Sequence, residues 1–279
     1  KETLVFAIAL AVGAIPEGLP AVVTIALAIG VQRMARRNAI IRRLPAVETL
    51  GSTTVICSDK TGTLTCNEMT VTELVTRQHT IRLSGIGYDP KGSLTRDGQP
   101  VGDLPADMAE LVQAAVLCND AGLHQGAEGW SISGDPTEAA LLVAARKANL
   151  QPEAITNRWP RIDAIPFASE TQSMLTLHDG DSRLAVLKGA PEVVMQRCVE
   201  AGDVAVHQQM IDAMHRLGAG GMRVLALASM PWPADQLLPA EVPDTGFRFL
   251  GLIGMIDPPR EEAIAAIAEI GRASCRERV

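Results

Sequence analysis

The segment CSDKTGTLT combines one carboxylate with the small hydroxyl residues that phosphoryl chemistry uses. Asp59 follows the apolar residues VIC and a serine, and is itself followed by Lys60, Thr61, Gly62 and Thr63. An aspartate can attack phosphorus and form an acyl phosphate when a cation and hydrogen-bond donors stabilise the phosphoryl oxygens. Lys60 supplies charge, and the threonines supply hydroxyl and amide donors. The segment predicts a phosphate-accepting aspartate; the simpler alternative is a capped turn after a strand.

A second carboxylate lies within an apolar run near the start of the chain. Between Thr3 and Val31 the only ionisable residue is Glu17. About 20 apolar residues span a bilayer, so the run predicts a transmembrane helix over residues 1–31, with a long buried core helix as the alternative. The basic residues that follow are Arg33, Arg36, Arg37, Arg42 and Arg43. Under the positive-inside rule, the chain after the span is expected in the cytoplasm.

The motif AIPEGLP interrupts this expected helix. Pro16 and Pro20 each lack a backbone donor, so carbonyl oxygens upstream of the break lose their helical partners. Together with Glu17 these oxygens would suit a hard cation near the middle of the membrane. A proline kink, with Glu17 protonated or paired to another helix, explains the motif equally well on these residues alone.

The rest of the chain predicts an α/β core interrupted by an α+β insertion. STTVICSD, residues 52–59, is expected to form a buried strand of a parallel sheet that presents Asp59 at its carboxyl end. Turn-rich segments follow from about Thr70, and later come short strands over SMLTLHD, RLAVLKGAPE and MRVLALASM and a helix over PEVVMQRCVEAG. PADMAELVQAAVLCND and DPTEAALLVAARKA predict helices, the second with Asp135 as N-cap. FLGLIGMIDPPREEAIAAIAEI predicts a strand, a loop and a helix.

Composition excludes several classes of function. The 279 residues carry a formal net charge of −7, so the overall charge gives no indication of nucleic-acid binding. The five cysteines are scattered without CxxC pairs, which argues against a disulfide framework or a zinc site. The five histidines show no HExxH spacing. There is also no GxxxxGK[ST] motif, so the chain is not expected to use a P-loop.

CSDKTGTLT resembles the phosphorylation signature of P-type cation-transporting ATPases, and AIPEGLP resembles the broken fourth transmembrane helix of their type II branch. The resemblance runs from Lys1 to about Ile270. It implies that ATP phosphorylates Asp59, with Lys60 beside it, and that Asp59 and the Thr61 carbonyl help to hold Mg²⁺. It also implies that Glu17 ligates the transported cation. The backbone carbonyls that would join Glu17 are those of Val12, Gly13 and Ile15.

Four later motifs resemble the family's nucleotide-binding domain: GDPTEAAL, IPFASETQSM, KGAPE and MRVLALA. The resemblance implies that Phe167 stacks on adenine, that Lys188 lines the purine pocket and that Arg223 contacts the phosphates. DPPR resembles the hinge that returns to the phosphorylation domain. Taken singly, Phe167 is more readily an ordinary core aromatic, and Arg223 an ordinary charge at a helix or strand end. The residues implied to bind ATP and its phosphates are Thr63, Thr137, Glu138, Phe167, Gln172, Lys188, Gly189, Arg223, Leu225, Asp257 and Arg260.

The resemblance implies a domain order and shows two departures. Residues 32–71 would hold a stalk and the first part of a Rossmann-like, haloacid dehalogenase-type phosphorylation domain. The nucleotide-binding domain would cover residues 72–248, and residues 249–270 would return to the phosphorylation domain. Many relatives carry lysine where Gln172 stands, so charge at the nucleotide would come more from Lys188 and Arg223. The ending GRASCRERV, residues 271–279, matches no family motif and is expected to be a non-native tail.

The expected function is part of an ATP-driven pump that moves Ca²⁺, Na⁺, K⁺ or another hard cation across a membrane, most simply a bacterial plasma membrane. Its partners would be the cation, the lipid bilayer and the remaining domains of the pump, with no nucleic acid. This segment alone is expected to bind nucleotide without transporting. The alternative is a membrane-anchored phosphohydrolase with an aspartate nucleophile. Such an enzyme needs an acid two residues after Asp59, where Thr61 stands.

Overall fold

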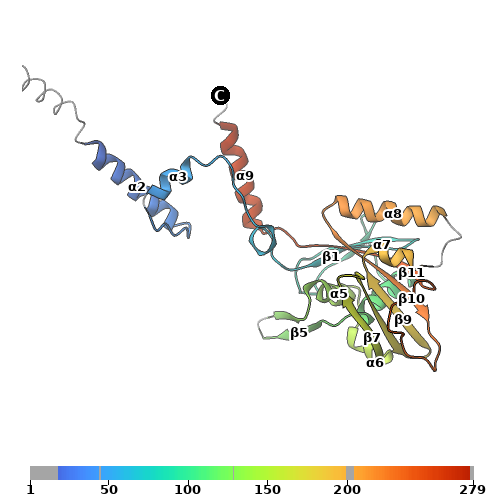
Figure 1. The fold of residues 1–279 in the computed structure, drawn as a ribbon. Helices are drawn as coiled ribbons and strands as arrows, with labels where there is room; N and C mark the ends of the chain where they lie inside the picture. Colours follow the sequence, from blue (N-terminus) through green and yellow to red (C-terminus); the bar gives the residue numbers. More distant parts are fainter. Residues whose placement is uncertain (1–17, 44, 128, 199–203, 277–279) are drawn as a thin grey trace, which may run out of the picture. The chain divides into compact units, whose positions relative to one another are not determined.

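The computed structural model describes residues 18–43, 45–127, 129–198 and 204–276 (Figure 1). The chain divides into two compact units, Lys1–Ser58 and Asp59–Val279. In the first unit the helices are α2 (Leu19–Ala35) and α3 (Pro45–Gly51). The second unit contains a large sheet and most of the helices.

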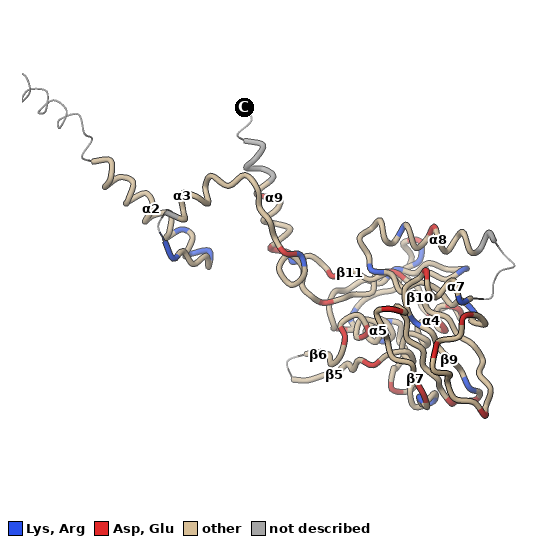
Figure 2. Tube along the Cα trace, viewed as in Figure 1, with Lys and Arg blue, Asp and Glu red and all other residues tan. Residues whose placement is uncertain are grey.

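Helix α2 begins just after the expected break in the apolar run. Gly18 is its N-cap, and Pro20 lies in the first turn, where a missing backbone donor costs no hydrogen bond. Leu19 and Ile25 are among its exposed apolar side chains. Figure 2 shows the basic residues gathered where the helix ends, with no acidic residue among them.

The prediction of a spanning helix is only partly addressed by the structure. Among the described residues, no helix has both the length and the apolar character to cross a bilayer. The transport-site residues expected from the motif lie outside the described residues. These are Val12, Gly13, Ile15 and Glu17.

The second unit is built on a nine-stranded antiparallel sheet with the order β4-β3-β2-β1-β11-β10-β9-β8-β7. Its strands are β1 (Thr70–Val75), β2 (Thr80–Leu83), β3 (Leu94–Arg96), β4 (Gln99–Pro100), β7 (Arg161–Ala168), β8 (Ser173–Asp179), β9 (Arg183–Gly189), β10 (Arg223–Pro231) and β11 (Arg248–Ile256). The hairpin β5 (Gly122–Gly126) and β6 (Gly129–Ser133) forms a separate two-stranded sheet. The helices are α4 (Ala106–Leu117), α5 (Pro136–Lys147), α6 (Pro152–Arg158), α7 (Pro191–Gln196), α8 (Val204–Ala219) and α9 (Glu261–Arg276).

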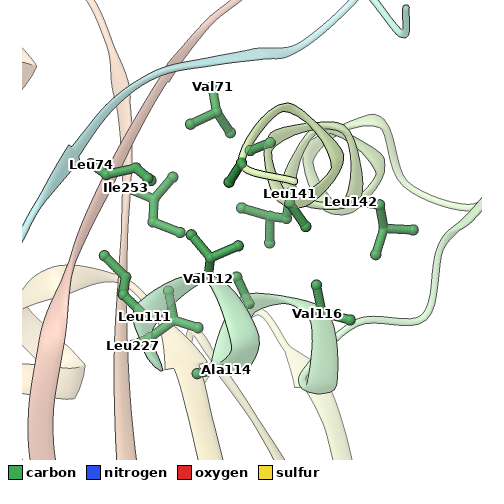
Figure 3. Close-up of a cluster of buried hydrophobic side chains, with 14 of the residues drawn as sticks. Val71, Leu74, Leu111, Val112, Ala114, Val116, Leu141, Leu142, Leu227 and Ile253 are labelled. Carbon is green, nitrogen blue, oxygen red and sulfur yellow. The ribbon is translucent and has the colours of Figure 1, made fainter. Parts of the chain in front are cut away.

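Two apolar layers cover the two faces of this sheet, because successive side chains of a strand point to opposite faces. Leu74 and Ile253 pack with the buried residues of α4 and α5, including Leu111 and Leu141. Figure 3 shows these side chains meeting between the two helices and the strands. The neighbouring strand residues pack with α7 and α8 instead; Leu252 is an example. Figure 1 shows α5 and α8 on opposite sides of the sheet.

The prediction of a buried parallel strand over residues 52–59 is wrong. Residues 53–59 form neither helix nor strand, and the side chains of Val55 and Ile56 are 74% and 66% exposed. A strand buried on both faces needs hydrogen-bonded neighbours and covering helices. In the described part of the chain, no strand pairs with this segment. The sheet that does form is antiparallel, not the parallel sheet expected around Asp59.

Several other predicted elements are confirmed, and one boundary differs. Helices α4 and α5 lie where the periodicity placed them, and Asp135 is the N-cap of α5. Strand β11, expected to begin the return to the phosphorylation domain at residue 249, instead pairs with β1 and β10 inside the antiparallel sheet. Helix α7 ends at Gln196, shorter than the pattern in PEVVMQRCVEAG suggested.

Candidate nucleotide site and phosphorylation loop

The N-terminus of α5 positions the first pair of predicted nucleotide residues. The Asp135 carboxylate accepts a hydrogen bond of 2.7 Å from the Thr137 backbone N–H, and Pro136 occupies the first turn. An N-cap of this kind satisfies a backbone donor that the helix leaves unpaired. It therefore fixes Thr137 and Glu138 in the first turn of a helix whose following residues are buried.

Lys188 is the most enclosed cation of the site. Its Nζ lies 2.6 Å from Glu138 Oε1 and 2.5 Å from the carbonyl oxygen of Cys118. The side chains of Lys188 and Glu138 are only 6% and 16% exposed. The second carboxylate oxygen of Glu138 accepts the backbone N–H of Asp120 at 2.7 Å. A buried charge persists when it is paired and hydrogen-bonded in this way.

Arg223 connects strand β10 to the start of α5. Its guanidinium donates to Thr137 Oγ1 at 3.0 Å. Leu225, two residues along the strand, lies on the same face and packs against the α4–α5 layer. Val224, between them, belongs to the layer of α7 and α8. Alternation along one strand thus directs both predicted residues, Arg223 and Leu225, toward the Lys188 side of the sheet.

Gly189 and Gln172 meet where the end of strand β9 lies beside the start of strand β8. A Cβ atom on Gly189 would lie 2.5 Å from the Gln172 carbonyl oxygen and 2.9 Å from Ser173 Cα. Gln172 has a positive φ of 48°, and its carbonyl accepts the backbone N–H of Ala190 at 2.9 Å. Glycine at position 189 is therefore required by the close approach of two backbones.

Phe167 differs from the other predicted residues because most of its ring faces solvent. It lies near the end of β7, and its side chain is 60% exposed. An exposed phenylalanine does not contribute to the core, whereas its π-face remains available to a planar ligand.

An open depression of about 690 Å³ lies beside this group of residues. Gln172 contributes to its lining, whereas Phe167 and Lys188 do not. The other lining residues are Ala190, Pro191, Glu192, Met214, His215, Gly218, Ala219 and Val224. Because Val224 and Met214 belong to the α7–α8 layer, the depression opens mainly on the face opposite Lys188. We therefore take the side-chain contacts of Lys188, not this hollow, as the centre of the nucleotide site.

The predicted phosphorylation residues lie in a short turn, Lys60–Leu64, that follows the extended residue Asp59; Thr61 and Gly62 within it have non-helical backbone angles. Asp59, Lys60, Thr61 and Thr63 are all exposed. Gly62 has a φ of 73°, in the left-handed region that glycine adopts without strain. The turn thus carries its polar side chains outside any apolar core.

The DPPR segment holds this turn through two side chains, Asp257 and Arg260. Asp257 Oδ2 lies 2.6 Å from Thr65 Oγ1, and Asp257 Oδ1 accepts the Glu68 N–H at 3.3 Å. Arg260 donates to the carbonyl oxygens of Thr65 and Gly62 at 3.0 and 3.1 Å. Asp257 and Arg260 therefore contact the loop that carries Asp59, although the two segments are almost 200 residues apart in sequence.

Comparison with known proteins decides the family. A model described as "P-type ATPase, cytoplasmic domain N" matches residues 107–262. The chain belongs to the P-type ATPase family. It is 48% identical to "Cation-transporting ATPase pma1" of Synechocystis, with 94% of this chain and 30% of that protein covered. It is 46% identical to "Probable cation-transporting ATPase F" of Mycobacterium bovis over 96% of this chain and 31% of that protein.

A further relative is "Calcium-transporting ATPase" of Bacillus subtilis, 39% identical over 97% of this chain and 31% of that protein. The chain spans less than a third of the length of these relatives. The resemblance to type II P-type ATPases drawn from the motifs is confirmed by these matches. The match from residue 107 to residue 262 also includes β11, in agreement with its place in the antiparallel sheet.

The P-type ATPase motifs did not reveal every residue that holds the two sites. Thr65 is buried and accepts the Gly62 N–H at 3.2 Å while it contacts Asp257. It is the last residue of CSDKTGTLT. Its residue type does not distinguish it from the exposed threonines of that motif, so nothing in the sequence indicates its burial. Asp120 and Cys118 bind Glu138 and Lys188 through backbone atoms, which leave no signal in side-chain type.

The family implies Mg²⁺, and the donors present fit only part of its coordination shell. Among the described residues, no group of three or more His, Cys, Asp or Glu side chains is placed to hold a metal. Mg²⁺ commonly takes one or two protein oxygens and completes its shell with water and phosphate. The Asp59 carboxylate and the Thr61 carbonyl are donors of the appropriate hard type, so the loop fits a shared site.

Proposed function

We propose that the second unit binds ATP at Thr137, Glu138, Phe167, Gln172, Lys188, Gly189, Arg223 and Leu225. The observation that carries this proposal is the Lys188–Glu138 pair, held by Cys118 and Asp120 on the same face of the sheet as Arg223. The P-type ATPase family implies ATP as substrate.

The geometry fits the parts of an adenine nucleotide. The exposed ring of Phe167 offers a stacking surface for a base, a contact worth about 1–3 kcal/mol in other proteins. Glu138 is an acceptor suited to an amino group, and Arg223 is a cation suited to phosphate oxygens. Because Lys188 is already paired, its main role in this proposal is to hold Glu138 and line the pocket.

For the whole pump, we propose that a carboxylate oxygen of Asp59 attacks the γ-phosphorus of ATP. The bond from phosphorus to the β–γ bridging oxygen breaks, ADP leaves with that electron pair, and Asp59 carries an acyl phosphate. Lys60 lies beside the developing charge, and Thr61 and Thr63 offer donors to the phosphoryl oxygens. Mg²⁺, when bound, neutralises phosphate charge. Asp257 and Arg260 hold the loop through Thr65 and Gly62.

We also propose that the intact protein couples this reaction to transport of a cation past Glu17, with carbonyls of Val12, Gly13 and Ile15. Relatives named for calcium transport make Ca²⁺ the first ion to test. A bilayer and the other domains of the pump would be its partners, in a bacterial plasma membrane with the nucleotide site on the cytoplasmic side. The segment alone would bind nucleotide without transport.

The first experiment titrates the 279-residue chain with ATP and measures binding by isothermal titration calorimetry. The chain should bind, and Phe167→Ala should raise Kd about tenfold, because one stacking contact is lost. Ile162→Ala is the matched control, since Ile162 is another exposed apolar residue on β7; it should leave Kd within about twofold of the unmodified chain. Absence of binding, or equal effects of the two variants, would refute the assignment.

The second experiment tests the chemistry in the full-length pump. Incubation with γ-labelled ATP should give an acid-stable phosphoprotein, and Asp59→Asn should abolish the label. Glu17→Gln should leave nucleotide binding intact while it removes the dependence of labelling on the transported cation. Persistent labelling with Asn at position 59 would eliminate Asp59 as the nucleophile.

A further inference from the structure

Arg161 begins strand β7 and contacts the loop that follows helix α4. Its guanidinium lies 2.5 Å from Asp120 Oδ1 and donates to the carbonyl oxygens of Asn119 at 2.7 Å and Leu117 at 3.3 Å. Carbonyl groups at the end of a helix lack partners within the helix, and a cation satisfies them well. One side chain thus contacts hydrogen-bond acceptors on three residues of this loop, Leu117, Asn119 and Asp120.

The same loop supplies much of the support for the Lys188–Glu138 pair. The carbonyl of Cys118 accepts from Lys188, and the Asp120 N–H donates to Glu138 Oε2. The Asn119 side chain also donates to the Glu138 carbonyl oxygen at 2.8 Å. Every residue from 118 to 120 therefore binds a member of the pair or its backbone.

We infer that Arg161 is a positioning residue of the nucleotide site. It fixes the loop of residues 117–120, and the loop in turn fixes the carboxylate of Glu138 and the ammonium of Lys188. This inference rests on the proposed binding of ATP at these residues. Arg161 itself matches no nucleotide-binding motif, and none of its hydrogen bonds is to a predicted nucleotide residue.

A nearby arginine shows why the carbonyl contacts matter. Arg158 pairs with Asp181 at 2.6 Å, but both side chains are mostly exposed. An exposed ion pair contributes little to stability and positions little else. Arg161 is better enclosed, at 30% exposure, and divides its planar group between a carboxylate and two backbone carbonyls. Lysine cannot reproduce that geometry, because all its N–H donors lie on one nitrogen atom.

The test uses the 279-residue chain with Arg161→Gln, Arg161→Lys and the control Arg158→Gln. We expect Arg161→Gln to raise Kd for ATP about tenfold, the equivalent of one lost charge-assisted contact. Arg161→Lys should recover part of the affinity, to about threefold above the unmodified chain, and Arg158→Gln should stay within about twofold. Thermal unfolding of each variant separates a positioning effect from general destabilisation.

Amide hydrogen exchange tests the role of Arg161 without nucleotide. In Arg161→Gln the Asp120 amide should exchange at least about tenfold faster, whereas the Ala139 amide, bonded to Asp135 within α5, should not change. If the unmodified chain binds no ATP, the proposed function fails, and the Asp120 amide still decides the inference. Unchanged Asp120 exchange, or ATP binding equal to that of Arg158→Gln, would overturn it. Should Arg161→Gln not fold, Arg161→Lys compared with Arg158→Lys decides by the same two measurements.

Discussion

The candidate nucleotide site and the candidate phosphorylation loop both carry family motifs, yet the chain supports them very differently. Lys188 and Glu138 are enclosed by a nine-stranded sheet and two helices, with a partner for each charged group. Around Asp59 the apolar residues Val55 and Ile56 face solvent, and the described chain offers them no strand partner. The loop is held instead by polar contacts from Asp257 and Arg260.

This difference shows that a family motif does not determine which contacts hold its residues in place. The nucleotide residues are held in place by burial, so their geometry is a property of the second unit's own packing. The phosphorylation residues are held by hydrogen bonds, each worth about 0.5–1.5 kcal/mol. We therefore expect substitutions near Lys188 to alter folding and binding together, and substitutions in the loop to act locally.

The largest effect is expected from Lys188→Met. Removal of the ammonium leaves the Glu138 carboxylate enclosed without its cation, which costs about 3–5 kcal/mol of unfolding free energy. Kd for ATP should rise by at least about thirtyfold as Glu138 leaves its position. Urea unfolding and calorimetry measure the two quantities.

A double variant provides the control for Lys188. Lys188→Met with Glu138→Gln removes both charges, so most of the lost stability should return while ATP binding remains weak. If the double variant is no more stable than Lys188→Met alone, the enclosed Lys188–Glu138 ion pair does not account for the difference in support between the candidate nucleotide site and the loop that carries Asp59.

Gly189→Ala should have the next largest effect, about 1–3 kcal/mol of destabilisation. The added methyl would meet backbone atoms of Gln172 and Ser173 at 2.5 and 2.9 Å, and neither strand can move without breaking its ladder. Gly218→Ala is a matched control within α8, where nothing lies within 4 Å of the added atom. That control should stabilise the chain by about 0.5–1 kcal/mol, since alanine favours helix. Similar losses for both variants would contradict the close approach.

A smaller and local effect is expected from Thr65→Val. The substitution keeps the shape and removes the hydroxyl between Gly62 and Asp257, at a cost of about 1 kcal/mol. Trypsin cleavage after Lys60 should accelerate, while Kd for ATP stays within about twofold. Thr63→Val removes an exposed hydroxyl from the same loop and should leave cleavage unchanged. Equal cleavage of both variants would show that Asp257 does not restrain the loop.

Local patterns predicted the elements that depend on local physics. Helix α5 followed from its periodicity and from Asp135, whose capping bond is made within two residues. Strands β8, β9 and β10 followed from short β-rich runs. The strand expected over residues 52–59 failed because a buried strand depends on neighbours that its own sequence does not encode. Sheet membership of β11 was missed for the same reason, since one of its partners, β1, lies in a distant segment, although the other, β10, is the strand before it.

The candidate sites show the same division. Family motifs supplied Lys188, Glu138 and Arg223 as separate residues, and the hydrogen bonds that join them come from the structure. Arg161 lies in no motif, and Thr65 lies in CSDKTGTLT without an assigned role. The role of Arg161 depends on backbone carbonyls, and that of Thr65 on a carboxylate almost 200 residues away. Such contacts arise from tertiary packing, which residue type and spacing do not report.

The smallest effect is expected from Asp59→Asn, although Asp59 is the residue on which the proposed chemistry depends. Its side chain is exposed outside the sheet, and exposed substitutions away from packed features change stability by less than about 0.5 kcal/mol. In the 279-residue chain, unfolding in urea and Kd for ATP should therefore match those of the unmodified chain. In the full-length pump the same substitution should remove the acid-stable phosphoprotein. A clear loss of stability or of ATP affinity in the short chain would mean that the loop and the nucleotide site are more tightly coupled than their separate supports indicate.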